Sequence, residues 1–183
     1  MSEVTDIEDA QADDPEALRG ALLDQLTYLV DEIEALQTVI GGLPEQIKSE
    51  RPAPDTLTMK ELYGAIATLD AEVRRPRVER IVAEDDPTLD PVDPDEAARE
   101  AGWNEKELPA ILDRVRAARQ DLVEALRDLP LDAWHRTATL DDASVTLSTL
   151  VHRATQADAE RLRALGSRLP GARLSERDEP LPT

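Results

Sequence analysis

A positively charged residue interrupts the apolar face of a helix predicted near the end of the chain. The stretch LSTLVHRATQADAERLRAL has apolar residues at helical spacing and predicts a helix over residues 147–165. Ala157 and Arg161 fall inside this apolar stripe, one turn apart. A buried guanidinium is costly without a partner. We therefore expect Arg161 to pair with an inward carboxylate (Glu61 or Asp70), to capture a small anion, or to pack its stem and extend its charge into solvent.

The other residue types that often do chemistry form no catalytic pattern. His135 follows a tryptophan in a predicted loop, where we expect an exposed or packing role, and His152 falls opposite the apolar stripe and should face solvent. The serines lack the context of a nucleophile elbow, and no glycine-rich phosphate loop is present. The chain has no cysteine, which excludes disulfides, thiolate metal sites and cysteine nucleophiles.

Metal binding is limited by the ligands available. Metal sites in helical bundles use histidines and carboxylates that project inward from facing helices. Two histidines, neither on an inward stripe, cannot supply a three-histidine site. A carboxylate-only site at Asp70, Asp158 or Glu61 stays open, although acidic residues are so abundant that a chance cluster is expected. We predict no metal and no other cofactor.

The charge balance limits the partners. The chain carries 40 acidic and 21 basic side chains, for a net charge of −19. Such a surface repels phosphates and anionic lipids, so we expect no nucleic-acid partner and no membrane partner. A structural or DNA-mimic role would instead require a basic partner whose binding weakens with salt. No apolar run is long enough to span a membrane, and the acidic first residues do not resemble a signal peptide, so we expect a cytoplasmic protein.

Long amphipathic helices must position these residues. The first is predicted from Asp14, an N-cap followed by Pro15, to Ile40, and Gly41 and Gly42 end it. Aromatic residues make up 2% of the chain and phenylalanine is absent, so the core must be aliphatic, which suits packed helices.

The second helix begins after a proline-containing connector. Thr58 and Glu61 form a capping box, and apolar spacing continues to Val82 with a kink or break expected near Pro76. The acidic, proline-rich residues 84–96 predict a solvated loop, because they lack the glycine and alternating ligands of a calcium loop.

The third and fourth helices complete the prediction. The third starts within residues 104–109 and ends before Pro130, and Trp134 anchors the loop that follows. Thr146 caps the fourth. We predict an all-α four-helix bundle over residues 14–170, no strand, and flexible tails at 1–13 and 171–183.

The order of these features resembles the DinB-like superfamily of four-helix bundles. A P-x-P connector and capped helix, RPAPDTLTMKELYGAI, precede the segment LRDLPLDAW and the final helix, which carry most of the resemblance. The resemblance covers about residues 16–166. The superfamily includes bacillithiol transferases and the metal-binding domain of mycothiol-dependent maleylpyruvate isomerases. It implies a homodimer formed through helix faces.

The same resemblance implies where a metal would be bound. Many members hold a divalent metal through three histidines, and these positions fall on Ala65, Ala157 and Arg161. Asp158, Glu160 and Leu162 match the residues around the last two, whereas Leu57 replaces a frequent tryptophan before the second helix. We interpret the chain as a member with a degenerate metal site that lacks the histidine triad.

Two classes of function follow from this interpretation, and whether the chain is an enzyme stays open. The first is a non-catalytic protein that binds a partner or a small anionic ligand, in a cleft near Ala65, Ala157, Arg161, Glu61 and Asp70. The second, implied by the resemblance, is a thiol-dependent S-transferase or a hydrolase-like enzyme. Metal-activated thiol chemistry needs a metal-bound thiolate, so the missing triad favours the first class.

Overall fold

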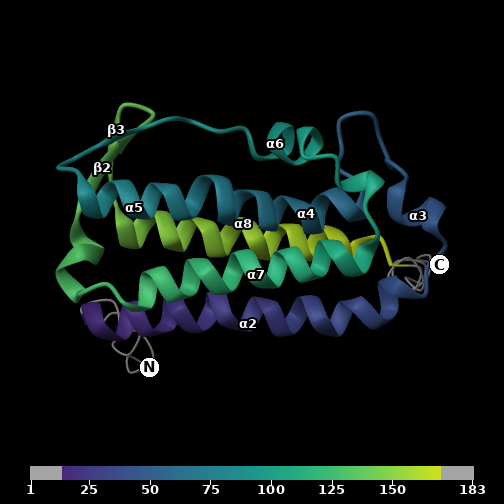
Figure 1. The fold of residues 1–183 in the computed structure, drawn as a ribbon, viewed down its shortest axis with the longest axis horizontal. Helices are drawn as coiled ribbons and strands as arrows, with labels where there is room; N and C mark the ends of the chain where they lie inside the picture. Colours follow the sequence, from purple (N-terminus) through teal and green to yellow (C-terminus); the bar gives the residue numbers. More distant parts are fainter. Residues whose placement is uncertain (1–13, 170–183) are drawn as a thin grey trace, which may run out of the picture.

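Four long helical segments lie side by side along the long axis of the molecule (Figure 1). The structure, a computed structural model, describes residues 14–169, and the predicted tails 1–13 and 171–183 lie outside them. The segments are α2 (Pro15–Gly41), α4 (Met59–Leu69) continued by α5 (Arg75–Ala83), α7 (Leu108–Arg127) and α8 (Leu147–Ser167). α2 and α4 each pack against both α7 and α8. The predicted all-α four-helix bundle is confirmed.

A long connection sets the directions of the helices. The chain leaves α5 and returns along the outside of α4 and α5 through the short helix α6 (Pro94–Glu100) before it enters α7 (Figure 1). As a result, α4–α5 and α7 run in the same direction, and α2 and α8 run opposite to them (Figure 1). The short helix α3 (Glu45–Ser49) lies near the start of α4, in the predicted connector.

The ends of the long helices follow the predicted capping residues. The Asp14 carboxylate accepts hydrogen bonds from the backbone N–H groups of Glu16 and Ala17. Thr58 and Glu61 form the predicted capping box, and the Thr146 hydroxyl accepts from the N–H of Thr149. These local signals are confirmed because a cap needs only neighbouring residues.

The predicted break near Pro76 is a π-helical turn. Residues Asp70–Arg74 form this turn, and the N–H of Arg75 donates to the carbonyl of Asp70, five residues earlier. Proline has no N–H to offer the helix, and the wider turn lets α4 continue into α5. The turn also brings Asp70, which is fully buried, and Arg74 into the bundle interior.

The prediction of no strand was wrong. A three-stranded sheet contains β1 (Thr88–Leu89), β2 (Thr137–Leu140) and β3 (Ala143–Thr146), with β1 parallel and β3 antiparallel to β2. Asp141 and Asp142 join β2 to β3 with φ of 52° and 60°, the pair of positive angles that tight hairpin turns need. Strands of four residues and a turn without glycine gave too weak a pattern for the sequence prediction.

The predicted solvated loop at residues 84–96 is partly regular structure. It contributes β1 and the start of α6, whose N-cap Asp93 accepts from Asp95 N and Glu96 N. Two 3-10 turns, Trp103–Glu105 and Leu131–His135, complete the described elements. Every helix among residues 14–169 is too short or too polar to span a lipid bilayer.

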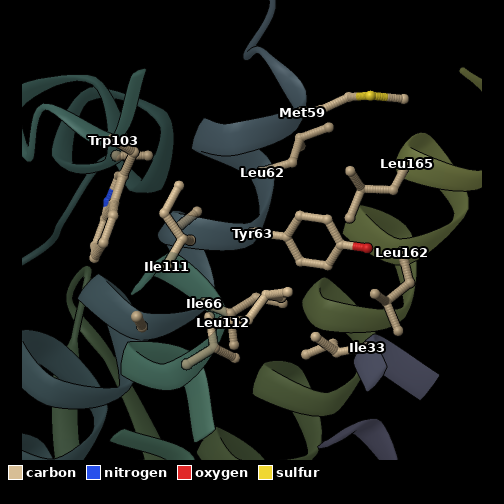
Figure 2. Close-up of a cluster of buried hydrophobic side chains, with 14 of the residues drawn as sticks. Ile33, Met59, Leu62, Tyr63, Ile66, Trp103, Ile111, Leu112, Leu162 and Leu165 are labelled. Carbon is tan, nitrogen blue, oxygen red and sulfur yellow. The ribbon is translucent and has the colours of Figure 1, made fainter. Parts of the chain in front are cut away.

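The core has two hydrophobic clusters. The first, which we call the Tyr63 cluster, fills one half of the bundle around Tyr63 and the Trp103 ring (Figure 2). The second, the Trp134 cluster, lies next to the small sheet and includes the predicted anchor Trp134, which is buried. His135 and His152 are both exposed.

Candidate functional site

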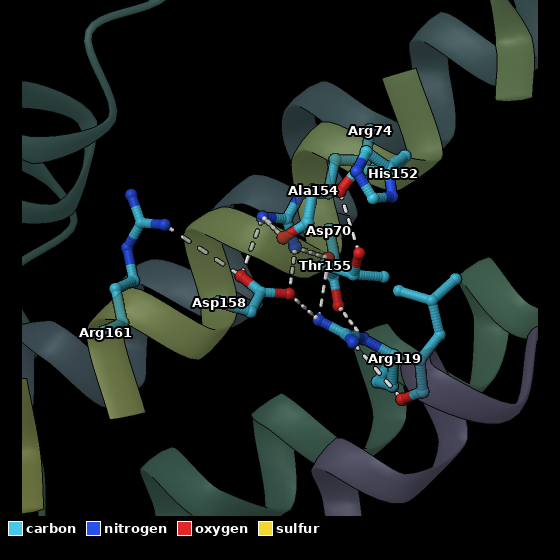
Figure 3. A network of polar contacts seen from close by, with 9 residues as sticks. Asp70, Arg74, Arg119, His152, Ala154, Thr155, Asp158 and Arg161 are labelled. Atoms are coloured by element: carbon cyan, nitrogen blue, oxygen red, sulfur yellow. Dashed lines mark hydrogen bonds and ion pairs between the residues drawn. The ribbon is translucent and has the colours of Figure 1, made fainter. Parts of the chain in front are cut away.

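Four charged residues, three of them fully buried and Arg74 largely so, lie where the two hydrophobic clusters meet. They are Asp70 and Arg74 from the π turn, Arg119 from α7 and Asp158 from α8, and we call them the ion cluster (Figure 3). On the α4–α5 segment, on α7 and on α8 they fall between residues of the Tyr63 cluster and residues of the Trp134 cluster. The ion cluster therefore joins the two halves of the core at mid-bundle.

Each aspartate of the ion cluster is held by both arginines. Arg74 Nη1 lies 2.7 Å from Asp70 Oδ1 and 2.8 Å from Asp158 Oδ2, and Arg74 Nη2 lies 2.7 Å from Asp158 Oδ1. Arg119 Nε lies 2.6 Å from Asp70 Oδ2, and its Nη2 lies 2.6 Å from Asp158 Oδ2. Two positive and two negative groups thus neutralise each other without solvent.

The remaining donors of these arginines find backbone carbonyls. Arg119 Nη1 donates to the carbonyl of Leu26 on α2 at 3.2 Å, so this one side chain contacts all four segments of the bundle. Arg74 Nη2 also donates to the carbonyl of Ala154 at 3.4 Å. Buried charges are tolerated when they are paired and fully hydrogen-bonded, and this cluster meets that condition.

The arginines set the ionisation of Asp158. Burial raises the pKa of this carboxyl, but Arg74 and Arg119 outweigh burial and hold its pKa below the ordinary value. Burial lowers the pKa of Arg74, and the charges of Asp158 and Asp70 more than reverse this, so its pKa is raised. Asp158 and Arg74 are therefore both ionised at neutral pH, as partners in a structural ion network would be.

Arg161 stays outside this network. Its Nη1 lies 3.9 Å from Asp158 Oδ1, beyond hydrogen-bonding distance, and its Nε is buried with no hydrogen-bond partner among residues 14–169 (Figure 3). The side chain is 10% exposed, and Nε is the one guanidinium nitrogen of Arg161 that is both fully buried and unpaired within residues 14–169. Burial lowers the pKa of Arg161, and Asp158 only partly offsets this.

The two carboxylates expected to pair with Arg161 have other partners. Asp70 belongs to the ion cluster. Glu61 completes the capping box at the start of α4 and accepts from Arg51 and from Asn104 Nδ2. The predicted pairing of Arg161 with Glu61 or Asp70 is therefore wrong, because nearer cations and donors already satisfy both carboxylates.

A cavity of about 210 Å³ lies beside Arg161. Its walls come from α2, the α4–α5 segment, α7 and α8, together with the loop before α6 and the small sheet. The lining residues in the described part of the chain are aliphatic side chains and four arginines: Arg74, Arg77, Arg153 and Arg161. The chain as a whole is strongly acidic, yet no carboxylate is among these lining residues of residues 14–169.

The structure brings together only some of the predicted site residues. Ala157 and Arg161 line the cavity, and Asp70 lies behind it in the ion cluster. Ala65 is fully buried in the Tyr63 cluster and does not line the cavity, and Glu61 lies at the start of α4 with its own partners. Of the five residues predicted to surround one cleft, Ala157 and Arg161 therefore line the cavity, and the other three do not.

Sequence reasoning missed Arg74 and Arg119. Arg119 is flanked by Ala118 and Leu122 on the apolar face of α7, which is the same signal that singled out Arg161. Arg74 stands one turn after Asp70. A search for opposite charges on the apolar faces of different helices would have found this cluster.

These residues do not fit a resident metal. No group of three or more histidine, cysteine or acidic side chains suited to a metal occurs within residues 14–169. The open possibility of a carboxylate-only site fails at Asp70 and Asp158, because their oxygens already accept from guanidinium groups. A cation placed there would have to displace two fixed positive charges.

Comparison with known proteins supports the fold. The chain resembles YfiT from Bacillus subtilis, described as a probable metal-dependent hydrolase with an unusual four-helix bundle topology, with a TM-score of 0.68. The two chains are 12% identical, and the match covers 86% of this chain and 87% of YfiT. No family model and no curated protein matches the sequence. At this identity, the likeness shows the fold and leaves the activity open.

Proposed function

We propose that this protein is a DinB-like four-helix bundle that has lost the three-histidine metal site and binds a small anionic ligand in the cavity beside Arg161, without catalysis. The observation that carries the proposal is Arg161, whose side chain is nine-tenths buried and whose Nε has no hydrogen-bond partner among residues 14–169. Burial of such a group costs free energy unless a ligand accepts its hydrogen bond and pairs with its charge.

The charge around the cavity supports an anion. The ion cluster is neutral as a unit, so the charge of Arg161 is left over, and Arg77 and Arg153 add two more positive charges to the walls. Burial lowers the pKa of Arg77, which a nearby anion would reverse. An anionic ligand would thus enter a positive cavity in a negative protein.

A ligand-observed NMR screen tests this proposal. Small organic anions and neutral analogues of the same shape are screened against the wild-type protein and against Arg161→Met. We expect several anions to bind the wild type and to lose binding in the variant. Arg163→Met is the matched control, because Arg163 lies on the same helix, is exposed and does not line the cavity. Equal binding of anions and neutral analogues would overturn the proposal.

The second candidate is a thiol-dependent S-transferase or hydrolase-like enzyme. It is favoured by the likeness in fold to YfiT, a probable metal-dependent hydrolase. Elemental analysis of untagged protein, produced with zinc, nickel and manganese supplied, separates the two candidates. We expect metal well below one equivalent per chain; one tightly held metal per chain would restore the enzyme.

A homodimer and a cytoplasmic location are part of the same proposal. A groove between α2 and α8 is lined by Tyr28, Leu36 and Leu162, and Tyr28 and Val39 of α2 are exposed. A second copy that packs on this groove would cover these apolar side chains. Sedimentation velocity of the wild type and of Tyr28→Glu tests the dimer, and cell fractionation tests the location.

A further inference from the structure

We infer that the ligand is an aliphatic monocarboxylate, whose carboxylate binds Arg161 and whose hydrocarbon chain lies along α8 toward Leu147. This inference rests on the proposed function and names its ligand class. It follows from three properties of the cavity: the chemistry of its walls, the number of charges left unpaired and the arrangement of its lining along one helix.

Most of the cavity wall is formed by aliphatic side chains, which favour a hydrocarbon ligand body. Apart from the four arginines, the lining from residues 14–169 consists of leucine, valine, alanine and proline side chains, such as Leu26, Leu122 and Val151. Sugars, nucleobases and peptides would bury hydroxyl or amide groups there without a neutral partner, at a high cost. A ligand whose body is a hydrocarbon chain has no such groups.

The unpaired charge selects a single carboxylate. Both terminal nitrogens of Arg74 are engaged by aspartates and by the Ala154 carbonyl, so this lining arginine offers no charge to a ligand. Arg77 donates to the carbonyl of Asp90, and Arg153 is exposed. Of the four lining arginines, Arg161 alone has a buried N–H with no hydrogen-bond partner among residues 14–169, and its planar fork matches a carboxylate.

The lining extends along α8. Leu147, Val151, Ala154, Ala157 and Arg161 all line the cavity, and the first and last are fourteen residues apart, or about 21 Å along a helix axis. The small side chains of Ala154 and Ala157 adjoin Arg161 in this row. The arrangement suits an elongated ligand with its charged end at Arg161.

Isothermal titration with straight-chain carboxylates from butanoate to decanoate tests the inference. We expect one site per chain, with affinity that rises about fourfold for each added methylene until the cavity is filled. Arg161→Met should weaken octanoate binding about 10- to 100-fold, Arg161→Lys should weaken it less, and the control Arg163→Met should leave it unchanged. Ala157→Leu should also weaken binding by filling the cavity without a change in charge.

The outcomes separate this inference from the proposed function. Octanoate binding that is unaffected by Arg161→Met and by Ala157→Leu overturns both the orientation and the site. Tighter binding of octyl phosphate than of octanoate, still dependent on Arg161, overturns the monocarboxylate class and leaves an anion-binding protein. Failure of every aliphatic anion to bind, while compact polar anions bind in the NMR screen, overturns the inference alone. Failure of all anions in both experiments overturns the proposed function as well.

Discussion

Arg119 on α7 and Arg161 on α8 both lie on inward helix faces, yet their surroundings differ. All three guanidinium nitrogens of Arg119 donate to Asp70, Asp158 or the Leu26 carbonyl, and the side chain is 2% exposed. Within residues 14–169, the Arg161 side chain is 10% exposed, lies 3.9 Å from its nearest carboxylate and has a buried Nε without a partner. The hydrogen-bonding capacity of the Arg119 guanidinium is thus used within the protein, whereas that of Arg161 is not used by the described residues.

The difference separates a structural role from a ligand-binding role. A buried guanidinium that is fully paired fixes the relative positions of the helices that supply its partners. A buried guanidinium that lacks partners and faces a cavity keeps its donors available for a ligand. The ion cluster and the cavity wall meet at Asp158, so variants of neighbouring residues can test the two roles separately.

The largest effect is expected from Asp158→Ala. This change removes the shared partner of Arg74 and Arg119 and leaves two buried cations with one aspartate. We expect a loss of about 3–5 kcal/mol in the free energy of unfolding, measured by urea denaturation. Asp121→Ala is the control, because Asp121 is exposed and its contact with Arg75 is a surface pair. A loss below about 1 kcal/mol would show that the ion cluster does not hold the bundle together.

A smaller loss is expected in acid, because protonation removes the charge of Asp158 and keeps its side chain. The pKa of this carboxyl is lower in the folded protein than its ordinary value. Its contribution to stability is therefore complete above about pH 3.9, the unfolded value, and is lost as the pH falls through the folded pKa.

Comparison of the wild type with Asp158→Asn separates the effect of this carboxyl on stability from the effects of the many other acidic side chains. Urea denaturation at a series of pH values should show that the stability difference between wild type and variant shrinks below pH 3.9. A difference that stays constant in acid would mean that the charge of Asp158 adds nothing to its hydrogen bonds.

Packing differs between Gly64, which is buried in the core, and Gly20, which lies near the start of α2 outside both clusters. A Cβ on Gly64 would lie 2.2 Å from the Trp103 ring, whereas a Cβ on Gly20 would meet nothing within 4 Å. We expect Gly64→Ala to destabilise by about 1–3 kcal/mol through overpacking, and Gly20→Ala, inside α2, to stabilise by up to about 1 kcal/mol. Thermal denaturation measures both. Equal effects of the two changes would show that Trp103 is free to move away from Gly64.

The fold was predictable where the signals are local and periodic. Asp14, Thr58 and Thr146 cap the helices as the sequence predicts, because a cap depends on residues within one turn. The hairpin at Asp141 and Asp142 was missed, because its strands are short and are stabilised by contacts with β1, which is distant in sequence.

The candidate site was predictable only in part. Helical spacing placed Arg161 on an inward face, and the structure confirms that position. Helical spacing could not predict the partner of Arg161, because the partner depends on which residues of the other helices lie at the same height along the bundle axis. Arg74 and Arg119 took the carboxylates that were expected to face Arg161, and the π turn before Pro76 set the level of Asp70.

The smallest effect on stability is expected from Arg161→Met. Methionine keeps most of the apolar stem and removes a buried donor that has no partner in the described part of the chain, so we expect the free energy of unfolding to stay within about 1 kcal/mol of wild type. Urea denaturation of both single variants and of Asp158→Ala with Arg161→Met gives the coupling between the two side chains. A loss of about 3 kcal/mol or a comparable coupling would place Arg161 inside the ion cluster, and its donors would then not be available to a ligand. A coupling near zero would mean that Asp158 does not offset the free-energy cost of burying Arg161. A bound anion would then supply the interaction that the protein does not.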